Sequence, residues 1–293
     1  MLVAVADAGS FSRAAAALDL TQPSLSRQIA LLEKEIRQPL FVRTGRGAEP
    51  TEAGHLLISH ARAVLASNRQ ILNELLDLEG SPRGRIEIGM PPRIALVFAV
   101  PVITAFRARF PRATITVIEG LSLALRDMLI AGRLDMALLF DVRPAPQLDL
   151  EPLRRETMML VGPPGAKLPD RVSIRDLPRY PMVLPSAPNA IRGRVDAALE
   201  PDNLTLNVVA EVGAVQTTVA LVAAGVGYTV LPPSALGLAP LEQPLPTAPI
   251  KPDLLNVLML ALPQNVPSSR LARETASLLR DVLKSQALPF SAR

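Results

Sequence analysis

Residues 52 to 79 carry a single helical pattern, which no glycine or proline interrupts after Gly54. At about 1.5 Å per residue, a helix of this length extends for roughly 40 Å, longer than most helices inside a small domain. The pattern therefore divides the chain into a short N-terminal part and a long C-terminal part. Along it, seven residues recur at alternating spacings of four and three, the repeat of a coiled-coil seam: Leu57, Ala61, Val64, Asn68, Ile71, Leu75 and Leu78.

This seam predicts a helix that joins two copies of the chain. We expect dimerisation through five of its positions: Leu57, Val64, Asn68, Ile71 and Leu75. A polar residue such as Asn68 inside a seam can fix the register of two helices at some cost in stability. The alternative interpretation is an amphipathic helix that packs against its own domain.

Residues 21–36, TQPSLSRQIALLEKEI, predict a helix with one buried and one exposed face. Its apolar side chains have the spacing that packs against a core: Leu25, Ile29, Leu32 and Ile36. The opposite face carries Arg27, Ala30 and Lys34. Thr21 can cap this helix, and Pro23 is tolerated in its first turn because the missing N–H has no partner there.

A shorter helix is predicted over residues 10–18, with Ser10 as its cap, and only the turn DLTQ separates the two. A short helix, a tight turn and a second helix with a basic outer face predict a helix-turn-helix. The first residues of the second helix would then reach base edges in a DNA major groove: Gln22, Ser24, Ser26 and Arg27. The alternative is a surface helix in a small helical bundle.

The residues that follow favour DNA binding. Residues 39–51 predict a hairpin whose turn holds Arg46 between Gly45 and Gly47, a wing suited to contact phosphates or a minor groove. The net charge of the chain is +4, and residues 22–46 hold five basic residues against two acidic ones: Arg27, Lys34, Arg37, Arg43 and Arg46 against Glu33 and Glu35.

From residue 80 onward, short apolar strands alternate with amphipathic helices, which predicts two α/β lobes with mainly parallel sheets. The strands of the first lobe are predicted over 85–90, 114–120 and 134–140. Those of the second lobe are predicted over 157–163, 181–186, 206–212 and 227–232. A last strand over 254–262 and a last helix over 268–284 can belong to either lobe on periodicity alone.

Open α/β sheets bind ligands beyond the carboxyl ends of their strands, near the starts of helices. Polar side chains at four such corners are expected to bind an effector: Arg93, Ser122, Ser186, Asn189, Gln216 and Thr217. Each of them taken singly could be an ordinary cap or turn residue. Helix starts with hydroxyl, amide and guanidinium groups favour a small anionic metabolite.

The composition disfavours several other classes of protein. The chain has no cysteine and only two histidines, His55 and His60, so we expect no disulfide, metal or cofactor. No P-loop or G-x-S-x-G motif is present, and we expect no enzymatic activity. No signal peptide is evident, and Pro101 breaks the longest apolar run, so we expect a soluble cytoplasmic protein without a membrane partner.

The order AGSFSRAAAALDLTQPSLSRQIALLEKEIRQPLFVRTGRGAEPTEAG resembles the winged helix-turn-helix of LysR-type transcriptional regulators. The resemblance covers essentially the whole chain, and LDMALLF, LPSAPNAIRGRVDAAL and EVGAVQTTVALVAAGVGYTVLP are similar to the nitrogen assimilation control subgroup. It implies an α+β, multi-domain fold: an N-terminal winged helix-turn-helix, a long linker helix, and a two-lobed α/β effector domain similar to type 2 periplasmic binding proteins.

The same resemblance implies domain boundaries at 1–51 for DNA binding, 52–80 for the linker, 84–155 with 260–293 for the first lobe, and 156–259 for the second. It implies base or phosphate contacts at Gln22, Pro23, Ser26, Arg27 and Arg46, to which we add Ser24, Lys34 and Arg43. The family usually has several residues before the segment that opens this chain, so the first helix is expected to be shortened.

The expected function is therefore a sequence-specific regulator of transcription that a small-molecule effector modulates. Its expected partners are double-stranded DNA with a pseudo-palindromic site, a second copy or three further copies of the chain, and RNA polymerase. A solute-binding protein of periplasmic-binding type is the competing hypothesis, and it leaves residues 1–80 without a role. An α/β enzyme is a third, disfavoured by the missing catalytic residues.

Overall fold

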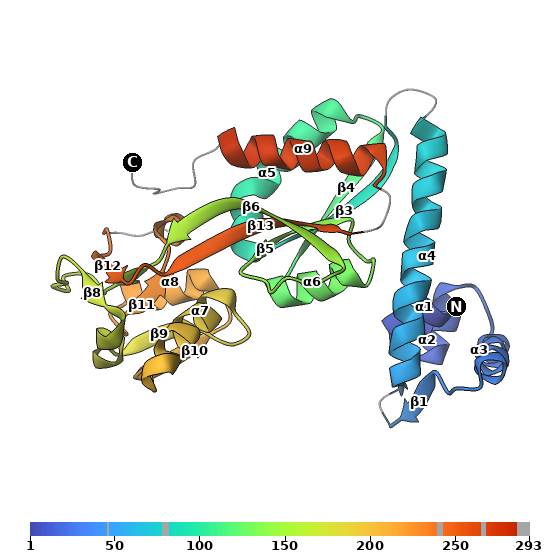
Figure 1. Cartoon of the computed structure of the whole chain (residues 1–293), viewed down its shortest axis with the longest axis horizontal. Helices are drawn as coiled ribbons and strands as arrows, with labels where there is room; N and C mark the ends of the chain where they lie inside the picture. The colour runs from blue at the N-terminus through green and yellow to red at the C-terminus, as the bar shows by residue number, and fades with distance from the viewer. Residues whose placement is uncertain (46, 78–81, 239–242, 265–267, 286–293) are drawn as a thin grey trace.

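The computed structural model describes residues 1–45, 47–77, 82–238, 243–264 and 268–285. A small helical domain and a larger α/β part lie on either side of a long helix (Figure 1). No helix among the described residues is long and apolar enough to cross a membrane.

The N-terminal domain is a winged helix-turn-helix built on one small core. It contains α1 (Leu2–Ala8), α2 (Phe11–Ala17) and α3 (Gln22–Ile36), followed by an antiparallel hairpin of β1 (Phe41–Thr44) and β2 (Gly47–Pro50). Although α1 has only seven residues, Val5 is fully buried beside Leu25, Ile29 and Leu40. This seven-residue helix therefore contributes to the core.

Helix α4 (Glu52–Asp77) is continuous, as the sequence predicts. Near its start, Ile58 is buried in the core of the N-terminal domain, with Leu57 packed at the edge of that core, and Arg62 forms an ion pair with Asp7 of α1. Farther along, Val64 and Ile71 are 68% and 53% exposed. The side chain of Leu75 lies outside the described residues.

The first lobe is a five-stranded sheet in the order β4-β3-β5-β13-β6. The strands β3 (Gly84–Met90), β4 (Ala113–Glu119) and β5 (Met136–Phe140) are parallel, whereas β13 (Leu255–Pro263) is antiparallel to both β5 and β6 (Leu148–Thr157). Helices α5 (Pro92–Arg109), α6 (Ser122–Ile130) and α9 (Arg270–Ser285) cover this sheet (Figure 1). The last strand and helix, β13 and α9, thus belong to the first lobe. Periodicity alone did not assign them to either lobe.

The second lobe has a four-stranded sheet in the order β11-β7-β12-β8 and a parallel pair of strands, β10 and β9. These strands are β7 (Met159–Val161), β8 (Val172–Ser173), β9 (Met182–Pro185), β10 (Val208–Val212), β11 (Thr229–Leu231) and β12 (Thr247–Lys251). The helices are α7 (Ala190–Leu199) and α8 (Val215–Ala223), with short 3-10 turns η1 (Ile174–Arg179), η2 (Glu200–Asp202) and η3 (Pro233–Leu238). Pairing in this lobe is more antiparallel than the sequence indicates, because β7 lies antiparallel to both of its neighbours.

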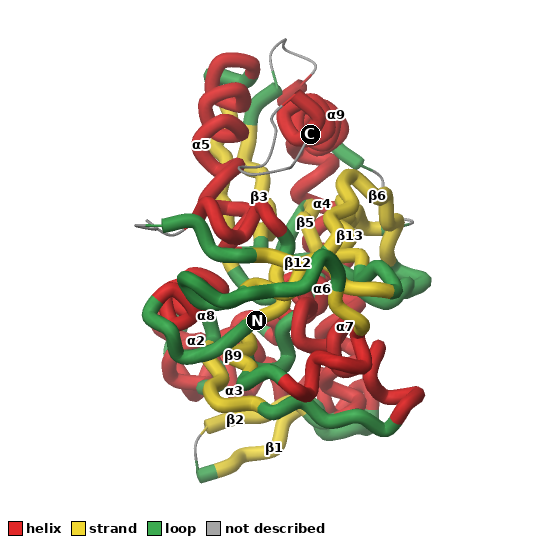
Figure 2. The backbone as a smooth tube through the Cα atoms, turned by 90° about the vertical axis from the view of Figure 1, so that its left-hand side faces the viewer, coloured by secondary structure: helices red, strands yellow, loops and turns green. Residues whose placement is uncertain are grey.

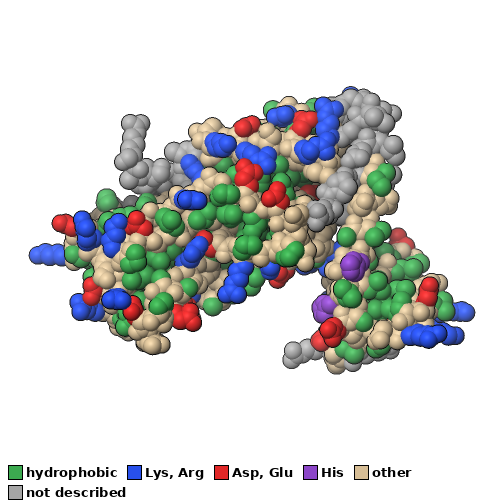
Figure 3. Space-filling model, in the orientation of Figure 1, with side chains coloured by type: hydrophobic (Ala, Val, Ile, Leu, Met, Phe, Trp, Pro, Cys, Tyr) green, Lys and Arg blue, Asp and Glu red, His purple; other side chains and the backbone are tan. Residues whose placement is uncertain are grey.

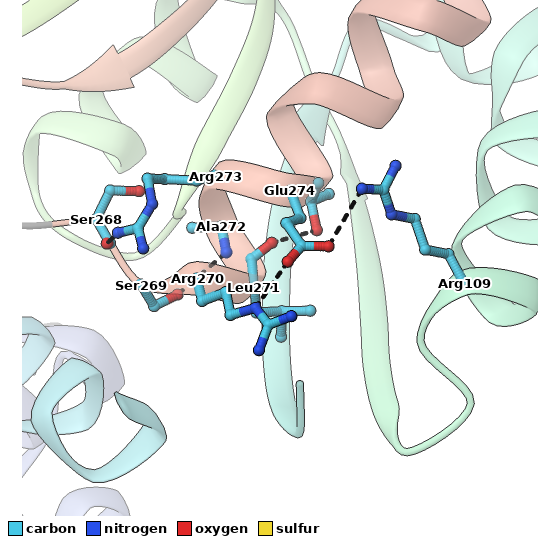
Figure 4. Close-up of polar contacts among 9 residues, drawn as sticks. Arg109, Ser268, Ser269, Arg270, Leu271, Ala272, Arg273 and Glu274 are labelled. Carbon is cyan, nitrogen blue, oxygen red and sulfur yellow. Dashed lines mark hydrogen bonds and ion pairs between the residues drawn. The ribbon is translucent and has the colours of Figure 1, made fainter. Parts of the chain in front are cut away.

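Polar contacts fix α9 on the first lobe (Figure 4). Glu274 accepts hydrogen bonds from Arg270 at 2.8 Å and from Arg109, at the end of α5, at 3.2 Å. The hydrogen bond from Arg270 is the main cause that lowers the pKa of the Glu274 carboxyl below its usual 4.5. A carboxyl with a lowered pKa in the folded state contributes stability above its unfolded pKa and loses that contribution as the pH falls.

We therefore expect Glu274→Gln to lower the free energy of unfolding at pH 7, by at most about 1 kcal/mol because the pair is partly exposed. Urea unfolding at a pH below the lowered pKa of this carboxyl should show a smaller difference. Asp281→Asn on the exposed side of the same helix serves as the control. An equal loss at both pH values would contradict the assigned role of the charge.

The exposed apolar side chains of α4 generate a second prediction. Replacing Ile71 with Asp should dissociate the oligomer, because it would place an unpaired charge between two paired helices. Light scattering measures the assembly. The control is Ala63→Asp, which adds the same charge to the same helix outside the seam. If Ile71→Asp leaves the mass unchanged, the contact between copies lies elsewhere.

Candidate DNA-binding surface and effector cavity

The start of α3 is organised by its own side chains. Thr21 Oγ1 accepts a hydrogen bond from the backbone N–H of Ser24 at 3.4 Å, and Gln22 Nε2 donates to Ser26 Oγ at 2.9 Å. Leu25 and Ile29 anchor the helix in the core of the domain. The first turn is therefore held in place before any DNA contact forms.

The side chains expected to contact DNA fall into three groups. Pro23, Ser24, Arg27 and Lys34 are exposed, and Lys and Arg side chains gather over α3 at the right edge of the molecule (Figure 3). Gln22 and Ser26 lie half-buried at the flank of that face, where they bond to each other. Arg46 and the side chain of Arg43 lie outside the described residues.

Sequence reasoning did not single out two further residues of this region. Gln28 is exposed one turn beyond Ser24, and helical spacing could have identified it. Glu33, an acid within the basic segment, accepts hydrogen bonds from the backbone N–H groups of Leu40 at 2.7 Å and Phe41 at 3.3 Å. It therefore fixes the start of the hairpin to α3. Figure 2 shows this hairpin at the end of the molecule opposite α5 and α9.

A cavity of about 100 Å³ lies between the two lobes, where the starts of α5, α6, α7 and α8 meet. Four of the six expected effector residues line it: Arg93, Ser122, Asn189 and Gln216. The other lining residues are mainly apolar, among them Leu121, Phe140, Ile191 and Val215. Ser186 and Thr217 are not among the lining residues, although each lies close in sequence to one that is.

The four helix starts differ in the hydrogen-bond donors that they leave for a ligand. Asn189 Oδ1 already accepts from the Ile191 N–H of α7 at 2.9 Å, and α5 begins with Pro92, which has no N–H. The starts of α6 and α8 have no side-chain cap. Their first N–H groups are therefore the donors best placed to receive an anion.

Arg93 lines the cavity, but its guanidinium already has partners. Only 5% of Arg93 is exposed, Nη2 lies 3.0 Å from Glu156 Oε2, and Nη1 donates to Ser234 Oγ at 2.6 Å. The guanidinium carbon also lies 4.6 Å from the centre of the Phe140 ring. The expectation of a guanidinium free to bind an anion is therefore revised: its charge is neutralised by Glu156.

A second ion pair lies near the pair of Arg93 and Glu156, and it connects the two lobes. Arg194 of α7 donates to the Asp141 carboxylate at 2.5 Å, and this hydrogen bond raises the pKa of the Arg194 guanidinium. When the Asn256 amide is oriented to satisfy both neighbours, its nitrogen donates to Asp141 at 3.0 Å and its oxygen accepts from Arg93 at 3.1 Å. The two arginines thus belong to one network with two carboxylates. Sequence reasoning missed Glu156, Ser234 and Asn256.

Within the described residues, no group of three or more His, Asp or Glu side chains is placed to hold a metal ion.

The geometry of α3 predicts different effects for two exposed cations. Arg27→Ala should reduce discrimination between specific and random DNA by about 1–3 kcal/mol, because the first half of α3 is the part that enters a major groove. Lys34→Ala, in the last turn, should weaken both kinds of binding alike and reduce their salt dependence. Fluorescence anisotropy at several salt concentrations separates the two effects. Equal losses on both DNAs for Arg27→Ala would contradict this assignment.

Comparison with known proteins agrees with this architecture. Residues 1–55 match the family described as bacterial regulatory helix-turn-helix protein, lysR family, and residues 79–284 match the LysR substrate binding domain. The nitrogen assimilation regulatory protein nac of Escherichia coli (strain K12) is 34% identical over 291 residues, 98% of this chain and 94% of that protein. The same-named protein of Klebsiella aerogenes is 35% identical over 80% of this chain and 76% of its own length.

Solved structures share the fold over 98% of this chain. A full-length OxyR variant from Pseudomonas aeruginosa has a TM-score of 0.75 at 22% identity and covers 98% of this chain and 93% of its own. Full-length BenM has a TM-score of 0.59 at 25% identity, with 98% and 97% covered. Together with the matches at both ends of the sequence, the helix-turn-helix and the two-lobed cavity show that the chain belongs to the LysR family of DNA-binding transcriptional regulators.

Proposed function

We propose that this regulator acts in the cytoplasm, without enzymatic activity, and that a small anionic metabolite bound between its lobes modulates its binding to DNA. The cavity at four helix starts is the observation that carries the proposal. The starts of α6 and α8, which have no side-chain cap, offer backbone N–H groups next to Ser122 and Gln216. Such donors favour a carboxylate or a similar group.

The proposed DNA contacts come from α3 and the hairpin. Pro23, Ser24 and Arg27 would meet the major groove, with Gln22 and Ser26 at the flank, while Lys34, Arg43 and Arg46 contact phosphates or the minor groove. Two such domains, paired through α4, would match the two halves of a pseudo-palindromic site. Full-length CbnR, which shares the fold with a TM-score of 0.55, has been solved in complex with its target DNA.

Among structures of the same fold, the effector binding domain of QuiR is in complex with shikimate, with a TM-score of 0.61 over 70% of this chain. This supports the proposal that the two-lobed part of this chain binds an effector. The solute-binding alternative gains no support, since a helix-turn-helix family matches the first 55 residues.

A thermal-shift screen of cellular metabolites tests the effector site. A ligand at a hundred times its dissociation constant should stabilise the parent chain by about 2.7 kcal/mol. Ser122→Ala and Asn189→Ala should weaken the binding of that ligand because both residues line the cavity. The matched control is Ser186→Ala, a change at a nearby serine outside the lining, which should leave the affinity unaltered.

A gel shift with DNA from upstream of the gene, with and without the metabolite, tests the coupling to DNA. If neither cavity substitution changes the affinity of the ligand, the ligand binds elsewhere on the protein. A broad screen without any ligand would contradict effector control, while DNA binding in the gel shift would still stand.

A further inference from the structure

The charges around the inter-lobe cavity are balanced by the protein itself. Arg93 is the one charged side chain among the described residues that line the cavity, and Glu156 neutralises it at 3.0 Å. Both are largely buried, with side chains 5% and 12% exposed. A buried, hydrogen-bonded ion pair of this kind has little remaining attraction for a further anion.

The fold fixes Glu156 in this position. Glu156 lies opposite Asn256, a residue that lines the cavity, so the pairing of β6 with β13 sets its position. The neighbouring charges balance as well, because Asp141 pairs with Arg194. No excess positive side-chain charge is therefore left among these four groups.

The remaining attraction for an anion comes from the helix starts. Each helix start carries a fractional positive charge whether or not a side chain caps it, and the starts of α5, α6, α7 and α8 all meet at the cavity. These backbone dipoles can stabilise a carboxylate on a ligand. A second carboxylate would enter a partly closed, mainly apolar space that offers no unpaired positive side chain, which is costly.

We propose that Glu156 determines the charge of the effector: by neutralising Arg93, it restricts the cavity to small monoanions and rejects dianions. The inference rests on the proposed function, since it concerns the same cavity. Glu156 acts through Arg93 and does not itself line the cavity. A short monocarboxylate with an apolar body fits the cavity lining of Leu121, Ile191 and Val215.

Succinate and succinamate are suitable probes, because they have nearly the same shape and differ by one negative charge. Their affinities can be compared by NMR titration of the full chain, which measures weak binding. In the parent chain we expect succinamate to bind at least about tenfold more tightly than succinate. In Glu156→Gln the freed Arg93 charge should favour succinate instead, by about tenfold or more.

Matched variants separate charge from structure. Glu151→Gln removes an acid from the same strand whose partner is Arg280, 2.8 Å away and outside the cavity lining, and it should keep the parent's preference. Glu156→Gln leaves a buried arginine unpaired and can destabilise the fold. The double variant Arg93→Gln, Glu156→Gln removes both charges and should also keep the preference for succinamate.

Three results would overturn the inference. They are equal or tighter binding of succinate by the parent chain, failure of Glu156→Gln to bind succinate, and loss of succinamate binding in the double variant. The last would mean that Arg93 contacts the ligand directly. These outcomes are distinct from failure of the proposed function, which shows as the lack of any metabolite that binds the cavity and alters DNA binding.

Discussion

The pairing of β13 with both β5 and β6 is the constraint on which the larger part of this molecule depends. It returns the end of the chain to the first lobe, so two strands cross between the lobes side by side, and the Met158 N–H bonds to the Leu254 carbonyl at 2.8 Å where they cross. The same register places Asn256 opposite Glu156 and Leu258 opposite Phe140. The floor of the inter-lobe cavity is therefore a product of strand pairing between distant segments.

This dependence explains which parts of the site could be predicted from the sequence. The faces of α3 follow from a local period of 3.6 residues, and Leu25 and Ile29 are buried as that period predicts. Ser122, Asn189 and Gln216 were found because helix starts after strands are recognisable locally. Ser186 and Thr217 lie within a few residues of lining positions, but neighbours along a helix or turn point in different directions.

The remainder of the site has no local signal. Glu156 lies in β6, a strand with charged residues and Pro152 whose pattern does not alternate cleanly, and this strand was predicted only at its last residue. Its role comes from register with β13, which is about a hundred residues away along the chain. Burial of Arg93 beneath Ser234 depends equally on the docking of the second lobe. The sequence shows which side chains carry a charge. It does not show which of these charges a partner neutralises in the folded protein.

Helix α4 gives the molecule a mechanical property. Arg62 bonds to α1 on one side, and Gly132 of the first lobe lies so close that an added Cβ would be 3.4 Å from the Arg62 carbonyl oxygen. A continuous helix of 26 residues is about 39 Å long. A tilt of about 5° at one end would displace the other by roughly 3 Å, about the rise of one base pair. Where two copies pair through α4, as proposed above, rotations of this size would alter the spacing of their DNA-reading helices.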